Sequence, residues 1–364
     1  MSGWTSKAVT DGLASGRQVR SCPGLVPVAA AVTVAAAATL HFTGFHMEER
    51  PKLAIYTDDV GAQAFAFIPS RFPQVEVRIT KTAGGFMEAA QEAEIVCMAR
   101  RYTRSMVLGA RHLKWLHLGG AGIDRLLPLS DFDPEIIITH SPGLNAEMMA
   151  DYVLCVILML VWDFPRLIRN QLERRWERWS VERLEDKTLA LIGLGNIGRA
   201  VALRATAMRM RVIGVKRSPD SVPGVERVVG PNQLHDILCE ADFVVLAVPL
   251  TGETRGMIGS REFHAMKETA YLINVGRGAV VREQALIVAL KKGDLAGAAL
   301  DVFENEPLPP DSELWRLENA IISPHISASS KDYRARVARV FCLNLERYLS
   351  HQPLLDIIDR SREY

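Results

Sequence analysis

The sequence lacks the features that mark several classes of protein. Its 364 residues carry 43 basic and 42 acidic side chains, so the net charge of +1 indicates neither a nucleic-acid surface nor an acidic partner. The five cysteines form no Cys-x-x-Cys pair, so we expect a reducing compartment without a disulfide framework or a metal site. No internal repeat of fixed period occurs. What is present is ordinary globular composition, 48% hydrophobic and 23% charged, in a chain long enough for two domains.

The first 46 residues differ from the rest. They contain few acidic groups and an apolar run over residues 25–40, mostly alanine and valine, with Pro27 inside it. This run is shorter than the roughly 20 residues that a membrane span needs. A signal or transit peptide and a membrane anchor stay open, but an unstructured extension, or a start codon placed upstream of a true start at Met47, is favoured. We expect a cytoplasmic protein, with organellar targeting by residues 1–46 as the alternative.

Strand-like and helix-like segments alternate from residue 52 onward. Helices or turns, such as 86–94 and 106–111, separate strands expected at residues 53–57, 75–80, 95–99, 113–118 and 136–139. This alternation predicts a parallel sheet covered by helices on both faces. The long apolar stretch 145–160 contains two acidic residues and indicates a buried connecting helix rather than a membrane span.

A second alternation begins near residue 187. Its strands are expected at residues 188–194, 211–216, 243–248, 271–275, 298–302 and 321–323, and a final helix at 331–350. Six strands of this kind match a complete dinucleotide-binding sheet. The fold class predicted is therefore α/β, with two Rossmann-like domains of doubly wound parallel sheets. A cleft between them should lie at the carboxyl ends of the strands.

A glycine-rich loop follows the first strand of the second alternation. The run Gly193-Leu-Gly195-Asn196-Ile197-Gly198 lies between an apolar strand and a helix expected over 197–208. In this context the glycines predict a tight turn, a close approach of the pyrophosphate and close helix–strand packing. The helix N-terminus would offer free N–H groups to the phosphates.

The end of the next strand bears on the choice of cofactor. A carboxylate usually stands there to bind the ribose 2′-hydroxyl of NAD, but this chain has Lys216, Arg217 and Ser218. A guanidinium can bind a 2′-phosphate through two hydrogen bonds. NADP(H) is therefore favoured, and NAD(H) stays possible if these are only solvated charges.

Three further segments each begin where a strand ends. They are Ile-Asn-Val-Gly-Arg277-Gly, Ala-Leu-Asp301-Val-Phe-Glu-Asn-Glu306-Pro and Ser-Pro-His325-Ile-Ser327. Together with the glycine loop, their order and spacing resemble the D-isomer-specific 2-hydroxyacid dehydrogenase family, most closely its glyoxylate/hydroxypyruvate reductase-like branch. The resemblance covers about residues 52–358.

The resemblance implies a domain organisation. A flavodoxin-like substrate domain would comprise residues 47–147 and 327–364, with a Rossmann NAD(P)-binding domain inserted at 148–326 and an extension at 1–46. It also implies reduction of a small 2-keto acid, such as glyoxylate or hydroxypyruvate, to the D-2-hydroxy acid.

The resemblance also implies three catalytic residues, Arg277, Glu306 and His325. Histidine suits proton transfer near neutral pH, and a carboxylate partner would hold its ring in the donating form. Arg277 would orient the substrate carboxylate and stabilise charge on the carbonyl oxygen.

Other residues correspond to family binding positions. Asp301 would hold the nicotinamide carboxamide, and the backbone N–H groups of Ala121 and Gly122 would bind the substrate carboxylate. The remaining cofactor contacts expected are Val248, Pro249, Thr254, Val275, Gly276, Arg277, His325 and Ser327, with Arg277 and His325 also binding substrate.

Some interpretations stay open. Arg100 and Arg101 follow a strand, and a solvated pair is favoured over a pair facing the cleft. The resemblance implies that Trp176 and Trp179, in an expected charged helix, lie at a homodimer interface, where simple packing is favoured over an aromatic that reaches the partner's site. Glu306 argues against the formate dehydrogenase branch of this fold, where a glutamine replaces the glutamate. The alternative from another class is a nucleotide-sensing transcriptional corepressor of the same fold, although the chain has no basic localisation run.

Overall fold

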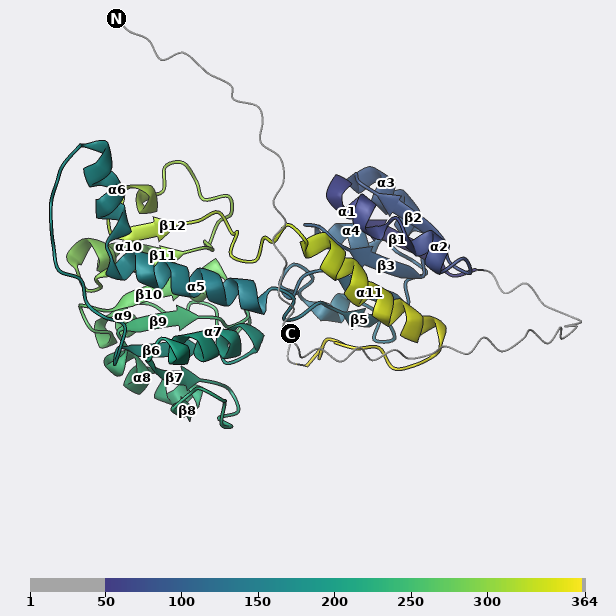
Figure 1. Ribbon diagram of the computed structural model, residues 1–364. Coiled ribbons are helices and arrows are strands. Elements are labelled where there is room, and N and C mark those ends of the chain that lie inside the picture. Colours follow the sequence, from purple (N-terminus) through teal and green to yellow (C-terminus); the bar gives the residue numbers. More distant parts are fainter. Residues whose placement is uncertain (1–49, 362–364) are drawn as a thin grey trace, which may run out of the picture. The chain divides into compact units, whose positions relative to one another are not determined.

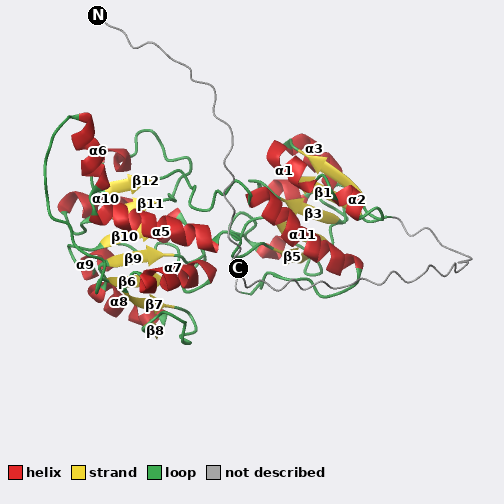
Figure 2. Ribbon diagram, in the orientation of Figure 1, coloured by secondary structure: helices red, strands yellow, loops and turns green. Residues whose placement is uncertain are grey.

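The computed structural model describes residues 50–361. The predictions for the extension at 1–46 therefore lie outside the described residues. Two parallel sheets, each flanked by helices, organise the described part (Figures 1 and 2). The predicted α/β class with two Rossmann-like sheets is confirmed.

The first sheet has five parallel strands. They are β1 (Lys52–Tyr56), β2 (Glu76–Thr80), β3 (Ile95–Met98), β4 (Trp115–Leu118) and β5 (Ile137–Thr139), in the order β2-β1-β3-β4-β5. This is the flavodoxin-like order. Its helices are α1 (Asp59–Phe65), α2 (Ile68–Arg71), α3 (Ala83–Ala90), α4 (Arg104–Leu108) and the C-terminal α11 (Tyr333–Leu349). Strands β1, β3 and β4 are almost wholly buried because apolar clusters cover both faces of this sheet.

The second sheet has seven parallel strands. They are β6 (Thr188–Ile192), β7 (Arg211–Val215), β8 (Arg227–Val229), β9 (Phe243–Leu246), β10 (Tyr271–Asn274), β11 (Gly297–Leu300) and β12 (Ala320–Ile322). Their order, β12-β11-β10-β9-β6-β7-β8, reverses direction between β6 and β9, as in a dinucleotide-binding sheet. The helices of this part are α7 (Asn196–Ala207), α8 (Leu234–Glu240), α9 (Ser260–Ala265) and α10 (Glu283–Lys292). Short 3-10 turns occur at Leu129–Asp131, Pro231–Gln233, Gly278–Val280 and Glu313–Arg316.

The chain passes between the two sheets twice. After β5 it enters α5 (Ala146–Val161), whose apolar residues pack with α7 and the second sheet. After β12 it returns to α11, whose buried face, including Phe341 and Leu345, packs against the first sheet. The expected buried helix at 145–160 is thereby confirmed.

Two sequence expectations are wrong. The predicted sheet lacked β8, a three-residue edge strand that is too short to stand out as a periodic run. The expected charged helix around Trp176 and Trp179 ends early, because α6 (Phe164–Leu172) stops before a left-handed residue at Arg174 (φ 54°). Both tryptophans lie in irregular chain, where Trp179 is half-buried with the guanidinium of Arg166 4.4 Å from its ring centroid.

Candidate active site

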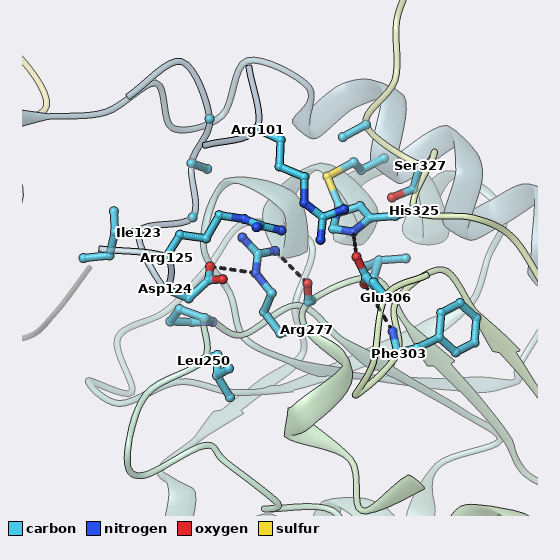
Figure 3. Close-up of a pocket in the computed structure, with 18 of the residues that line it drawn as sticks. Arg101, Ile123, Asp124, Arg125, Leu250, Arg277, Phe303, Glu306, His325 and Ser327 are labelled. Atoms are coloured by element: carbon cyan, nitrogen blue, oxygen red, sulfur yellow. Dashed lines mark hydrogen bonds and ion pairs between the residues drawn. The ribbon is translucent and has the colours of Figure 1, made fainter. Parts of the chain in front are cut away.

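A cavity of about 790 Å³ is lined by segments that follow strands of both sheets. The first sheet contributes the segments after β3 and β4, and the second contributes those after β9, β10, β11 and β12. The carboxyl ends of parallel strands are where α/β proteins bind ligands, because loops and free N–H groups gather there. Figure 3 shows Arg277, Glu306 and His325 in this cavity.

Arg277 enters the cavity from a rigid turn after β10. The amide nitrogen of Asn274 donates to the carbonyl of Arg277 (3.1 Å), and its amide oxygen accepts from the N–H of Gly276 (3.1 Å). The guanidinium donates through Nε to Asp124 (2.9 Å) and through Nη1 to the carbonyl of Gly276 (2.9 Å). These contacts fix Arg277 and leave Nη2 as the group that can face a ligand.

His325 and Glu306 form a hydrogen-bonded pair at one side of the cavity. Nδ1 of His325 lies 2.8 Å from Oε2 of Glu306, and Oε1 of Glu306 accepts from the N–H of Phe303 (3.3 Å). Burial acts to raise the pKa of Glu306, but the hydrogen bond and charge of His325, the Phe303 N–H and the charge of Arg101 together hold it below its usual value. Glu306 is therefore a carboxylate that orients the ring, and Nε2 of His325 is left for a substrate.

The backbone of His325 is unusual for a residue with a side chain. Its φ of 54° lies in the left-handed region, and its N–H donates to the carbonyl of Ser323 (3.0 Å). Strain of this kind persists only where surrounding contacts impose it, and it concentrates at functional sites.

Asp301 supplies those contacts. Its fully buried carboxylate accepts from the hydroxyl of Ser323 (2.5 Å) and from the N–H groups of Ile326 (2.8 Å) and Ser327 (3.0 Å). Asp301 does not line the cavity. In this structure its carboxylate holds the loop that presents His325, a role that its motif did not reveal.

The glycine loop has the geometry of a phosphate cradle. Gly193 has a φ of 106°, and a side chain there would lie 2.6 Å from the carbonyl oxygen of Ala247. A Cβ on Gly198 would lie 2.1 Å from the carbonyl oxygen of Gly193, whereas one on Gly195 would meet nothing within 4 Å. Gly195 is also the N-cap of α7 and offers no side chain to the first N–H groups of that helix. This open approach to a helix N-terminus fits the pyrophosphate of a dinucleotide.

The residues expected to read the 2′-phosphate lie apart from the cavity. Lys216 forms an ion pair with Asp220 (2.5 Å), and Arg217 forms one with Glu253 (2.7 Å). Ser218 is exposed. Thr254, expected at the adenosine side, has its hydroxyl within the turn itself, where it accepts from the N–H of Thr251 and donates to the carbonyl of Pro249.

The structure brings about half of the expected site residues to one cavity. Those that line it are Ala121, Gly122, Ile197, Val248, Pro249, Val275, Gly276, Arg277, Glu306, His325 and Ser327. Those that do not line it are Gly193, Gly195, Asn196, Gly198, Lys216, Arg217, Ser218, Thr254 and Asp301.

Sequence reasoning missed several lining residues. Asp124 and Arg125 lie one residue beyond the Gly-Gly-Ala-Gly turn after β4, and that position was the only signal for them. Tyr102, Tyr333 and Arg334 also line the cavity, and no motif marks them. Arg100 and Arg101, interpreted as a solvated pair, both line the cavity instead.

In the described part of the chain, neither a metal centre nor a single membrane-spanning helix is found. Within residues 50–361, no group of three or more histidine, cysteine, aspartate or glutamate side chains is placed to hold a metal ion. No single helix there is long and apolar enough to cross a membrane, although α5 and α6, bent by 61° at their junction, pass together by length and composition.

The sheet order, the glycine loop and the cavity define a two-domain dinucleotide-binding protein of the dehydrogenase type. The profile described as D-isomer specific 2-hydroxyacid dehydrogenase, NAD binding domain, matches residues 154–327. A glyoxylate reductase of Thermofilum pendens is 34% identical over 267 residues, which are 70% of this chain and 77% of that protein. The chain belongs to the D-isomer specific 2-hydroxyacid dehydrogenase family, a family of oxidoreductases, as its motifs predict.

Other similar proteins carry related names. A glyoxylate reductase of Korarchaeum cryptofilum is 39% identical over 220 residues, which are 58% of this chain and 65% of that protein, somewhat less than two thirds of its length. A solved D-isomer specific 2-hydroxyacid dehydrogenase from Xanthobacter autotrophicus, in complex with NADPH and MES, has a TM-score of 0.76 at 30% identity and covers 86% of this chain and 100% of its own. An NADPH-dependent glyoxylate/hydroxypyruvate reductase from Sinorhizobium meliloti, in complex with NADP and sulfate, has a TM-score of 0.76 at 26% identity with the same coverage.

Proposed function

We propose that this protein reduces the keto group of a small 2-keto acid, of the glyoxylate or hydroxypyruvate kind, to the D-2-hydroxy acid. The observation that carries the proposal is the hydrogen-bonded pair of His325 and Glu306 in the same cavity as the fixed guanidinium of Arg277. A proton donor and an anion-binding cation are the two groups that ketone reduction needs from the protein.

Each residue of the site acts through an atom that no other protein group within the described residues occupies. When bound, the nicotinamide cofactor supplies the hydride that adds to the keto carbon. His325 gives the proton on Nε2 to the keto oxygen, while Glu306 holds Nδ1 and stabilises the positive ring before transfer. Nη2 of Arg277 and the backbone N–H groups of Ala121 and Gly122 bind the substrate carboxylate.

The cofactor that we propose is NADP(H), with NAD(H) as the alternative. The strand end that usually bears a carboxylate carries Lys216 and Arg217, and the Xanthobacter and Sinorhizobium proteins were solved with NADPH and NADP. In these ion pairs Asp220, Arg217 and Glu253 are exposed and Lys216 is half-buried, and a phosphate dianion would be a stronger partner than one carboxylate.

We also propose a homodimer that buries the apolar surface of α6 and its flanks. Exposed large apolar side chains concentrate there: Trp162, Phe164, Leu167, Ile168, Leu172 and Trp176. A patch of this kind is typical of an interface. The relatives described above are reductases and dehydrogenases, which lends no support to the corepressor alternative, and we do not propose it.

One assay tests the proposal. The purified full chain is mixed with NADPH or NADH and with glyoxylate, hydroxypyruvate, pyruvate and bulkier 2-keto acids, and cofactor oxidation is followed. His325→Ala should lower kcat by a factor on the order of 10² or more, because proton donation contributes that much. His112→Ala, which changes an exposed histidine outside the cavity, is the matched control. Cofactor binding without turnover on any substrate, or a normal rate in His325→Ala, would overturn the proposal.

A further inference from the structure

The cavity has an excess of fixed positive charge. Five arginines line it, Arg100, Arg101, Arg125, Arg277 and Arg334, against two carboxylates, those of Asp124 and Glu306. Cations that converge in a cleft repel one another and attract anions.

Three of these arginines are committed to partners. Arg277 pairs with Asp124, and Arg334 pairs with Asp58 through two nitrogens. Arg100 donates to a backbone carbonyl at 2.9 Å and lies over the ring of Tyr56. The positive charges of these three arginines are therefore partly compensated by contacts within the protein.

Arg101 and Arg125 differ from these three in having no hydrogen-bond or ion-pair partner in the described residues. No hydrogen bond or ion pair to either one occurs within residues 50–361, and both are exposed at the cavity. In Figure 3 their side chains extend toward the guanidinium of Arg277 and the ring of His325. Arg101 acts electrostatically on Glu306, and Arg125 acts with Arg277 on the hydroxyl of Tyr102, so both guanidinium groups lie close to the proposed chemistry.

A substrate with a single carboxylate does not use these two cations. In the proposed function, Nη2 of Arg277 and two backbone N–H groups already receive that carboxylate, and His325 faces the keto oxygen. A second anionic group on the substrate would satisfy Arg101 and Arg125 and would relieve their mutual repulsion.

We infer that the preferred substrate is a 2-keto acid with a second anionic group, a carboxylate or a phosphate, at the end distant from the keto acid, and that Arg101 and Arg125 bind this group. This inference rests on the proposed function and specifies its substrate class. Arg101 and Arg125 are specificity-determining residues, whereas Arg277 and His325 act on the keto acid that all substrates share.

The test compares matched pairs of substrates on the full chain with NADPH. One pair is 2-oxoglutarate and 2-oxopentanoate, and the other is 3-phosphonooxypyruvate and hydroxypyruvate. We expect kcat/KM to favour the doubly anionic member by roughly tenfold or more, because a charge-assisted hydrogen bond contributes about that factor. The pair with the larger preference shows whether carboxylate or phosphate is the natural second group.

Variants assign the preference to residues. Arg101→Gln and Arg125→Gln should each lower the preference for the doubly anionic substrate about tenfold, and Arg125→Lys should retain part of it. Arg111→Gln, an exposed arginine outside the cavity, should leave the preference unchanged. Calorimetric titration with 2-oxoglutarate, against 2-oxopentanoate, measures the same selectivity without turnover.

The outcomes separate the two proposals. Turnover of glyoxylate with no preference for either doubly anionic substrate overturns the inference and leaves the proposed function intact. An equal loss on both members of a pair in Arg101→Gln and Arg125→Gln also overturns it. Absence of turnover on every 2-keto acid overturns the proposed function, while selective binding of 2-oxoglutarate in the titration would still support the two arginines as an anion site.

Discussion

The guanidinium of Arg277 occupies the space that a side chain at position 122 would need. A Cβ built on Gly122 would lie 1.6 Å from Nη2 and 2.9 Å from Cζ of Arg277. Gly122 follows β4 and Arg277 follows β10, so a glycine in one sheet's loop lets a cation from the other reach the cavity. The close approach that a glycine permits at position 122 is therefore made, in this structure, by Arg277.

Gly122→Ala tests this relationship. The added methyl displaces Arg277 and its ion pair with Asp124, so kcat/KM for 2-keto acids should fall at least tenfold, since small misplacements of a positioning group cost that much. Gly120→Ala is the matched control, because a Cβ there would meet only the Tyr333 hydroxyl, at 3.7 Å. Equal activities of the two variants would show that Arg277 can move without loss.

Glu306→Gln should change the pH profile as well as the rate. Because its pKa is lowered, Glu306 is negatively charged at and above pH 4.5, and it loses this charge only as the pH falls through the lowered pKa. A glutamine keeps a hydrogen bond but not the charge that stabilises the imidazolium. Reduction, which needs a protonated ring, should therefore slow, and as the pH rises it should be lost at a lower pH than in the wild type. Oxidation of the hydroxy acid, which needs a neutral ring, should lose less. Profiles of kcat/KM in both directions measure this. A uniform loss without a shift would assign Glu306 a structural role only.

Arg217→Asp should shift the cofactor preference from NADPH toward NADH. The carboxylate repels a 2′-phosphate and can accept a hydrogen bond from a ribose 2′-hydroxyl. Glu253→Gln, which frees Arg217 from its ion pair, should instead strengthen NADPH binding. Dissociation constants for both cofactors measure the effect, and an NADPH preference that survives Arg217→Asp would place phosphate recognition elsewhere.

Leu172→Asp should dissociate the proposed dimer. Leu172 is 78% exposed at the end of α6, and a charge in the centre of an apolar interface is left without solvent or partner. Leu203→Asp introduces the same charge on α7, at another apolar residue that is 65% exposed. Sedimentation should show a monomer for the first variant and a dimer for the second. A monomeric wild type would refute the proposal at once.

His117 should make the fold sensitive to acid. It is fully buried on β4 between the hydroxyls of Thr139 (2.8 Å) and Ser141 (3.1 Å). Burial, with a smaller effect of His140, lowers the pKa of His117 from 6.5 to about 3. Because the unfolded chain binds a proton that the folded chain rejects, stability should fall by about 1.4 kcal/mol per pH unit as the pH drops below the ordinary pKa and toward the folded value.

The measurement is the free energy of unfolding as a function of pH. His117→Gln removes the titrating group, so its curve should be flatter than that of the wild type between pH 6.5 and about 3. His112→Gln, at an exposed position, should keep the wild-type slope. Parallel curves for the wild type and His117→Gln would mean that other groups control acid unfolding.

Local sequence patterns predicted most elements because the strands are buried on both faces and read as continuous apolar runs. They failed where few residues decide the structure. β8 has only three residues, and the segment after α6 is charged without an apolar stripe, so neither carries a periodic signal. The motif around Asp301 shows that an acid is present but not that Ser323 and Ile326 surround it as donors, and its contact with the nicotinamide stays a prediction.

By itself, the sequence determined the fold class, the family and which types of residue the proposed site contains. Glycine loops and strand-end motifs consist of residues adjacent in the sequence, so they can be recognised without knowing the tertiary contacts. Only the tertiary structure decided which charges are neutralised. Arg277 is paired with Asp124 across 153 positions of chain, while within residues 50–361 no hydrogen bond or ion pair holds Arg101 or Arg125. Electrostatic interactions depend on distance in space rather than along the chain. Which arginine has a carboxylate partner is therefore decided only when the two sheets bring these residues to one cavity.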